Sequence, residues 1–177
     1  MKFAKLAVGI CLTLAVAGCA DTPDLVGMTV SAPETPALRH GGAADAPYTA
    51  FGVQKVWTNG LSITISQARS LQPSETAFPQ APRMAVFVVT IMNGTKAEYR
   101  PSQLSIRALA AGKPAQEVLD SVQGLNGIAA AVRELPPGRD TTVTLAFAVP
   151  AEAVKMLLTI EPNGADQEPS ATFEGQA

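Results

Sequence analysis

Apolar and polar residues alternate along most of the chain beyond residue 48. Residues 61–66 read Leu-Ser-Ile-Thr-Ile-Ser, and residues 142–149 alternate strictly in the same way. A period of two sends successive side chains to opposite faces of a strand, so each segment predicts a strand with one buried face. The segments 104–108, 156–160 and 171–173 repeat the pattern over shorter lengths and predict three further strands.

One segment is apolar almost without interruption. Residues 84–92 include several β-branched side chains and are too few for an ordinary helix, so they predict a central strand covered on both faces. This strand is followed by Asn93-Gly94-Thr95, which predicts a turn. The triplet also fits the N-glycosylation pattern, but the turn is favoured.

Turn residues separate the predicted strands. Asn59-Gly60 stands between apolar residues at 51–57 and the strand at 61–66, which predicts a hairpin with a tight Asn-Gly turn. The sequence leaves residues 115–133 open, because Val118, Leu119 and Val122 fit either a strand or one helical turn. About seven strands with turns between them predict an all-β, immunoglobulin-like antiparallel β-sandwich over residues 48–177.

A different pattern precedes this domain. Residues 1–5 carry two lysines, and residues 6–17 are apolar and uncharged. The apolar stretch is shorter than the roughly 20 residues that a membrane-spanning helix needs, so residues 1–18 are interpreted as a signal peptide.

The end of the apolar stretch and the two residues after it resemble the bacterial lipobox: Leu14-Ala15-Val16-Ala17-Gly18-Cys19. The resemblance implies cleavage between Gly18 and Cys19 and a diacylglycerol thioether on Cys19, which would anchor the protein on the extracytoplasmic face of the cell membrane. An ordinary signal peptide with an incidental Cys19 is the alternative. Cys11 would leave with the leader, so Cys19 would then have no cysteine partner within the chain.

Residues 19–47 are rich in Pro, Ala and Gly and show no sustained period, so we expect a disordered tether between the lipid and the domain. The single histidine, His40, lies in this segment. A metal site usually needs three or four ligands, so we interpret His40 as a solvated linker residue.

The domain itself resembles the telokin-like, immunoglobulin-like domains of exported actinobacterial antigens and lipoproteins of unknown function. The similarity rests on turn and strand residues: Asn59-Gly60-Leu61, Asn93-Gly94-Thr95, Leu135-Pro136-Pro137-Gly138 and Phe147-Ala148-Val149-Pro150. It implies an extracytoplasmic sandwich with no agreed biochemical activity, and it assigns no binding residue.

Residues for catalysis or cofactor binding are scarce in the sequence. The formal net charge of −2 gives no basic excess for nucleic acid. A nucleophile needs a base, usually histidine, and the domain has none. Two carboxylate pairs, Glu117 with Asp120 and Asp166 with Glu168, are interpreted as solvated surface charge rather than Ca²⁺ ligands. We therefore expect no enzyme activity, no metal and no cofactor.

The sequence favours a non-catalytic interaction domain with an unknown ligand. The alternatives are an accessory or structural subunit of a cell-envelope complex, which would have a protein partner there, and a carrier of a small ligand or metal. The long, Pro-rich segment 72–82 is a candidate binding loop, although an ordinary connecting loop is favoured. Trp57 is interpreted as a core aromatic rather than an exposed binding residue.

Overall fold

The computed structural model describes residues 47–163 and 168–177. The predictions for the signal peptide, for cleavage at Gly18 and Cys19, for lipidation of Cys19 and for His40 lie outside the described residues. Within those residues the chain forms ten strands: β1 Thr49–Ala50, β2 Gln54–Val56, β3 Leu61–Ile65, β4 Arg69–Leu71, β5 Arg83–Asn93, β6 Ser105–Ala110, β7 Lys113–Ala115, β8 Asp140–Val149, β9 Lys155–Glu161 and β10 Ala171–Gln176.

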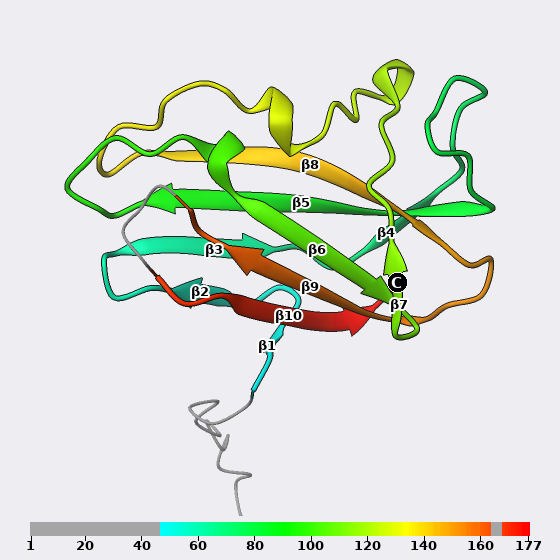
Figure 1. Cartoon of the computed structure of the whole chain (residues 1–177), viewed down its shortest axis with the longest axis horizontal. Helices are drawn as coiled ribbons and strands as arrows, with labels where there is room; N and C mark the ends of the chain where they lie inside the picture. The colour runs from blue at the N-terminus through cyan, green and yellow to red at the C-terminus, as the bar shows by residue number, and fades with distance from the viewer. Residues whose placement is uncertain (1–46, 164–167) are drawn as a thin grey trace, which may run out of the picture. The chain divides into compact units, whose positions relative to one another are not determined.

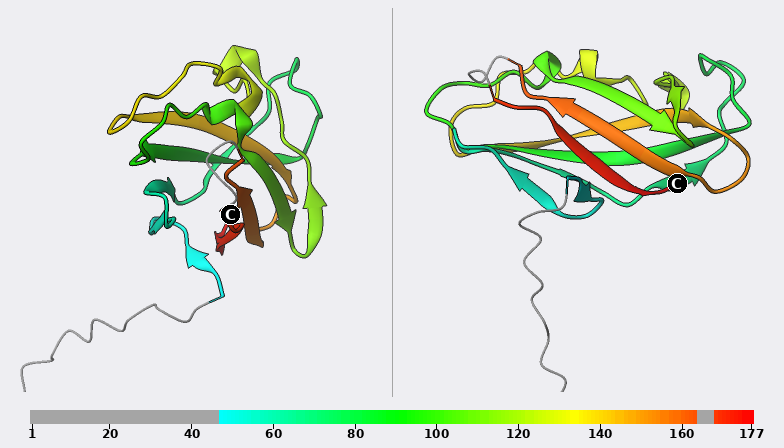
Figure 2. Two further views of the ribbon diagram at one scale, coloured as in Figure 1. Left: turned by 60° about the vertical axis from the view of Figure 1, so that its left-hand side comes forward. Right: turned by 60° about the horizontal axis from the view of Figure 1, so that its bottom comes forward.

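The strands form two packed sheets (Figures 1 and 2). One sheet has the order β1-β10-β9-β6-β7, in which only the β1–β10 pair is parallel. In the other sheet β5 is central. It pairs with β3 and β4 along one side and with β8 along the other, and β2 extends the sheet beyond β3.

This strand order is that of an immunoglobulin-like sandwich, in which one sheet has the order ABED and the other contains C, F and G. Strands β3, β5 and β8 take the places of A, B and E, and β6, β9 and β10 take those of C, F and G. Among the described residues, only a short segment around Glu117, which bridges Phe147 of β8, occupies the place of strand D. The predicted fold class is therefore confirmed.

The strand count exceeds the predicted seven because β1, β4 and β7 have only two or three residues each. An alternation of that length cannot be recognised in a sequence, so these strands depend on their neighbours rather than on their own pattern.

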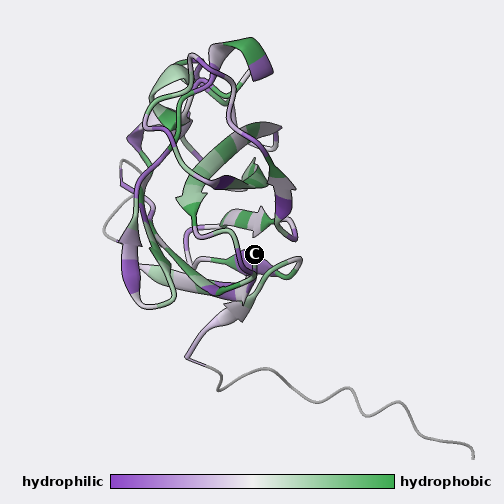
Figure 3. Cartoon of the chain, turned by 90° about the vertical axis from the view of Figure 1, so that its right-hand side faces the viewer, coloured by the Kyte–Doolittle hydropathy of each residue, from purple (hydrophilic) through white to green (hydrophobic). Residues whose placement is uncertain are grey.

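The core lies between the facing sides of the two sheets. Apolar residues of β3, β5, β8, β9 and β10 line it, and hydrophobic and hydrophilic residues alternate along the strands (Figure 3). Trp57 is 4% exposed within this core, and its indole N–H donates a hydrogen bond of 2.7 Å to the carbonyl of Pro169. The interpretation of Trp57 as a core aromatic is confirmed.

The outer face of β5 departs from the prediction. Met84 and Val86 are buried there as members of a second apolar cluster, but Met92 is 44% exposed near the other end of the strand. The expectation that both faces are covered is therefore correct only for the first half of the strand. Two loops, residues 72–82 and residues 116–127, cover this half of the strand.

Both Asn-Gly sequences form turns. The β2–β3 hairpin is confirmed, but residues 58–60 make a three-residue turn, with Gly60 at a φ of 95°. The Asn93 side chain is fully buried, and its amide nitrogen donates to the carbonyls of Ala97 and Leu135. The turn after β5 is confirmed, and the buried Asn93 amide is not presented for glycosylation.

The segment that the sequence left open contains both kinds of structure. Val118 donates to the carbonyl of Ala146 in β8 in the manner of a strand. Val122 lies in the short 3₁₀ helix η2, Ser121–Gln123. Two further 3₁₀ turns are η1, Pro101–Gln103, and η3, Ile128–Ala130. Within the described part of the chain, no helix is long and apolar enough to cross a membrane.

Candidate binding surface

Two loops distant in sequence meet at one end of the sandwich. Residues 72–82 connect β4 to β5, and residues 116–127 follow β7. Phe78 and Leu119 join the two loops, because each backbone N–H donates to the other residue's carbonyl, at 2.9 and 2.8 Å. This pair makes a small antiparallel bridge between segments that the sequence separates by about 40 positions.

A buried carboxylate fixes the two loops together. Asp120 is fully buried, and its oxygens accept the backbone N–H and the hydroxyl of Ser74, each at 2.8 Å. They also accept the side-chain and backbone N–H groups of Gln123 at 2.8 and 3.3 Å. Burial opposes ionisation of Asp120, but together these hydrogen bonds outweigh it and lower the pKa of its carboxyl below the ordinary value.

Two glutamine side chains complete the fixation of the 72–82 loop. Gln80 donates from its side-chain nitrogen to the carbonyls of Ser74, Glu75 and Ala77. Gln123 donates from the opposite loop to the carbonyl of Gln72 at 2.8 Å. The polar, Pro-rich loop therefore has a defined conformation that its own sequence does not specify.

Apolar side chains lie both beneath the two loops and on their exposed surface. Beneath them lies the second apolar cluster, formed by Ala77, Met84, Val86, Val118, Leu125 and Ala146. On the surface, Phe78 is 77% exposed and Leu119 is 47% exposed. A hollow of about 420 Å³ adjoins them, lined by Phe78, Pro79, Gln116, Glu117 and Leu119. We call these five residues the Phe78 surface.

Glu117 is the only ionisable residue of the Phe78 surface. Its side chain is half-buried and accepts the backbone N–H of Ile128 at 3.2 Å. Burial raises the pKa of the Glu117 carboxyl, and the hydrogen bond from Ile128 only partly offsets this. Gly127 packs closely here, because a Cβ on it would lie 2.8 Å from Leu119 and 3.0 Å from the Glu117 carboxylate.

The interpretation of the carboxylate pairs as solvated charge is wrong for Glu117 and Asp120, which are half-buried and buried. Asp166 lies outside the described residues. Glu168 is partly buried and accepts the hydroxyl of Thr58 at 2.7 Å and the backbone N–H of Asn59 at 2.9 Å. Sequence reasoning also missed Phe78, although an aromatic residue inside a polar, Pro-rich segment was a signal that could have found it.

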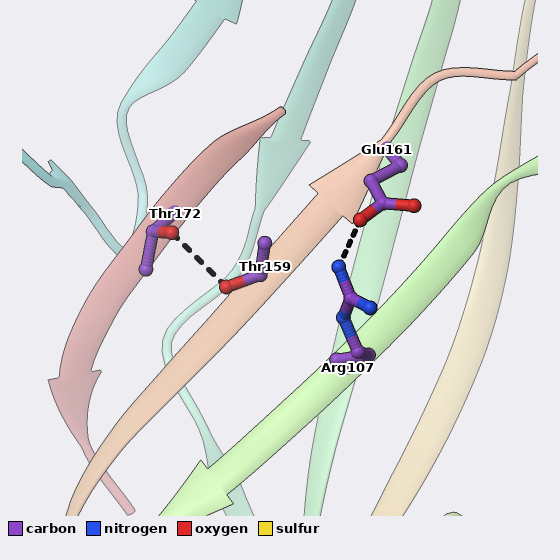
Figure 4. A network of polar contacts seen from close by, with 4 residues as sticks. All are labelled: Arg107, Thr159, Glu161 and Thr172. Atoms are coloured by element: carbon purple, nitrogen blue, oxygen red, sulfur yellow. Dashed lines mark hydrogen bonds and ion pairs between the residues drawn. The ribbon is translucent and has the colours of Figure 1, made fainter. Parts of the chain in front are cut away.

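The outer face of the β1–β10–β9–β6–β7 sheet offers a contrasting surface (Figure 4). There Arg107 forms an ion pair with Glu161, and the hydroxyls of Thr159 and Thr172 lie 3.0 Å apart in a hydrogen bond. These polar side chains are paired with one another. The Phe78 surface instead exposes large apolar side chains on a fixed backbone, which makes it the stronger candidate for binding.

No group of three or more His, Cys, Asp or Glu residues in the described ranges is arranged to hold a metal ion. Glu117 belongs to the Phe78 surface, and Asp120 lies beside Leu119 in the sequence. Asp120 uses its oxygens on loop hydrogen bonds.

No protein-family model matches the sequence, and a search of curated proteins finds no match. Solved structures with a similar fold include the candidate lipoprotein ycdA of Bacillus subtilis, with a TM-score of 0.55 and 14% identity over 69% of this chain. The chain spans only 38% of the length of ycdA. The yjhA protein of Bacillus subtilis matches 71% of this chain and 98% of its own, with a TM-score of 0.51 and 12% identity.

An uncharacterized β-sandwich protein of Clostridium difficile gives a TM-score of 0.44 and 15% identity over 72% of this chain and 93% of its own. Identities this low show a shared fold alone. The resemblance to telokin-like domains stays a prediction, because no family model matches the chain.

Proposed function

We propose that this protein is a bacterial lipoprotein, anchored through Cys19 on the extracytoplasmic face of the cell membrane, whose β-sandwich binds a protein partner without catalysis. The lipobox-like residues before Cys19 support the anchor. The structural similarity to ycdA, which is described as a candidate lipoprotein, is compatible with it.

The observation that carries the binding role is the fixed exposure of Phe78. The Phe78 side chain is 77% exposed to water, and covering it with a partner lowers the free energy of the complex. Because hydrogen bonds already fix the loop, little conformational entropy remains to be lost on binding. Exposed aromatic anchors on ordered backbones are typical centres of protein interfaces.

The partner that fits this surface is a protein with an apolar patch and a polar group able to meet Glu117. A raised pKa makes the Glu117 carboxyl easier to protonate, so it can donate as well as accept a hydrogen bond. An accessory subunit of an envelope complex is one form of the same proposal, with a stoichiometric rather than a transient partner.

The test is crosslinking in intact cells followed by purification from detergent, comparing the native chain with Phe78→Ala. We expect a specific crosslinked partner with the native chain and a loss of at least about tenfold in its yield with the variant.

Val56→Ala is the matched control, because Val56 is also an exposed apolar residue, at 56%, but lies in β2 away from the two loops. Equal crosslinking by Phe78→Ala and the native chain would exclude the Phe78 surface as the binding site. A partner that copurifies in fixed stoichiometry would identify the protein as a subunit of a complex.

A further inference from the structure

In the part of the chain that the structure describes, half of the outer edge of β8 has no strand beside it. Along β8, the N–H and C=O groups of Ala146 and Ala148 point away from β5, and there Val118 donates to Ala146 and Ala148 donates to Gln116. The alternation of an antiparallel strand points the same groups of Asp140, Thr142 and Thr144 outward too. Within the described ranges, none of these three residues has a backbone partner on that side.

The unpaired half of the β8 edge lies where strand D stands in an immunoglobulin-like sandwich. Strand D pairs with strand E in an immunoglobulin-like sandwich, and β8 takes the place of E. Here the chain fills the place of D only over residues 116–118 and then turns away through Asp120, whose backbone N–H bonds to Leu125 instead. Residues 140–144 of β8 therefore keep a free edge in line with a short segment that already pairs.

Short strands close most of the other sheet edges of the described chain and leave only short unpaired stretches, such as residues 105–107 of β6. The edge strands β1, β2, β4 and β7 have two or three residues each. The β7 edge contains Lys113 and Pro114, and charge and proline are common devices that discourage strand addition. Strand β8 has ten residues, and its free half contains Thr142 and Thr144, which favour extended pairing.

The free edge borders a groove. A hollow of about 470 Å³ is lined on one side by residues 140–143 of β8 and on the other by Pro101 and by residues of the 131–136 segment. Figure 1 shows this yellow segment passing beside β8 before it turns into the strand. The volume falls within the range of roughly 300–1,000 Å³ that is usual for ligand sites, and is too small for a folded domain.

Charge around the groove indicates the chemistry of its occupant. Glu134 forms an ion pair with Arg100. Arg133 and Arg139 are exposed and line the same groove, and neither forms an ion pair within the described chain. Asp140 is the only carboxylate of the groove without an ion pair, so the arginines outnumber it. An extended segment that carries a carboxylate would complement this excess.

We propose that residues 140–144 of β8 bind an extended segment of another protein by strand addition, with a carboxylate of that segment against Arg133 and Arg139. The added strand completes the place of strand D and hydrogen-bonds to the outward groups of Asp140, Thr142 and Thr144. This site is separate from the Phe78 surface, so either can fail without the other.

The experiment uses the full-length protein in detergent and a phage library of random linear peptides as the probe. Peptides that bind the native chain are counter-selected on Thr142→Pro, which deletes one outward N–H at a position where an edge strand tolerates proline. Thr142→Val is the matched control, since it keeps the backbone N–H and a β-branched side chain. We expect affinity within about twofold of native for Thr142→Val and at least about tenfold weaker for Thr142→Pro.

Two further measurements keep the test independent of how well the proline variant folds. Hydrogen exchange on the native chain should show new protection at the amides of Thr142 and Thr144 when a selected peptide binds. Arg139→Glu should weaken the acidic peptides at least about tenfold, whereas Lys96→Glu, which reverses an exposed cation outside the groove, should not.

Four results of the peptide experiments would overturn the proposal. They are equal binding to Thr142→Pro and Thr142→Val, protection confined to other amides, no carboxylate among the selected peptides, and no peptide enriched over the counter-selection. A native dimer that Thr142→Pro converts to a monomer would also overturn it, because the edge would then belong to a second copy of the chain.

Discussion

The carboxylate of Asp120 accepts both the backbone N–H and the hydroxyl of Ser74, a residue 46 positions earlier in the chain. This contact joins the 72–82 loop to the segment after β7 and holds the bridge between Phe78 and Leu119 in place. A fully buried carboxylate is unfavourable unless its oxygens are hydrogen-bonded, so the loop arrangement and the ionised state of Asp120 support each other.

We predict that Asp120→Asn lowers the melting temperature by several degrees. One oxygen would become an N–H₂ group facing N–H donors, which leaves buried donors unsatisfied. Because the folded pKa of Asp120 is lowered, its contribution to stability is present above the ordinary pKa and lost as the pH falls through the folded pKa.

Thermal melting across acidic pH values measures this directly. The acid destabilisation should be weaker in Asp120→Asn than in the native chain. Glu75→Gln is the control, because Glu75 is an exposed acid of the same loop. An unchanged acid dependence in Asp120→Asn would contradict the assignment.

The stability contributed by Glu117 should depend on pH in the opposite direction to that of Asp120. Its pKa is raised by burial, so its contribution to stability is fully present below the ordinary value and lost as the pH rises through the folded pKa. Glu117→Gln keeps an oxygen for the N–H of Ile128 without the charge. We expect the variant to melt at a higher temperature than the native chain near neutral pH, and at nearly the same temperature in acid. A difference in melting temperature that does not vary with pH would show that Glu117 ionises normally.

Gly94→Ala should destabilise the fold by about 1–3 kcal/mol, as overpacking typically does. A Cβ on Gly94 would lie 2.3 Å from the carbonyl oxygen of Gly60, and this contact is with backbone, which cannot rotate away. Chemical denaturation measures the free energy of unfolding. A Cβ at Gly112 meets nothing within 4 Å, so Gly112→Ala, which bears only the strain of its φ of 76°, separates crowding from backbone conformation.

Cys19→Ala should move the protein from the membrane fraction to the soluble or secreted fraction. Two acyl chains bind a bilayer firmly, at roughly 0.8 kcal/mol for each buried CH₂, and the variant cannot receive them. Cell fractionation with intact-mass measurement tests this, and the melting temperature should stay the same. A variant that remained in the membrane with an unchanged mass would exclude lipidation at Cys19.

Local sequence patterns determined most of the strands and turns. The alternation at 61–66 and 142–149 and the turns at Asn59-Gly60 and Asn93-Gly94 are all present in the structure. A period of two and a turn sequence act within a few residues, so both can be recognised before the fold is known. The same patterns were enough to predict a two-sheet sandwich.

Only the tertiary structure decided which polar residues are buried and which apolar residues are exposed. Asp120 is buried with hydrogen bonds that Ser74 supplies from another loop. Phe78 is exposed while its backbone bonds to Leu119, and Ala77 beside it belongs to the buried cluster. The free edge of β8 depends on where the chain turns away from that strand after Val118. These features come from contacts between segments far apart in sequence, and a local pattern contains no information about such contacts.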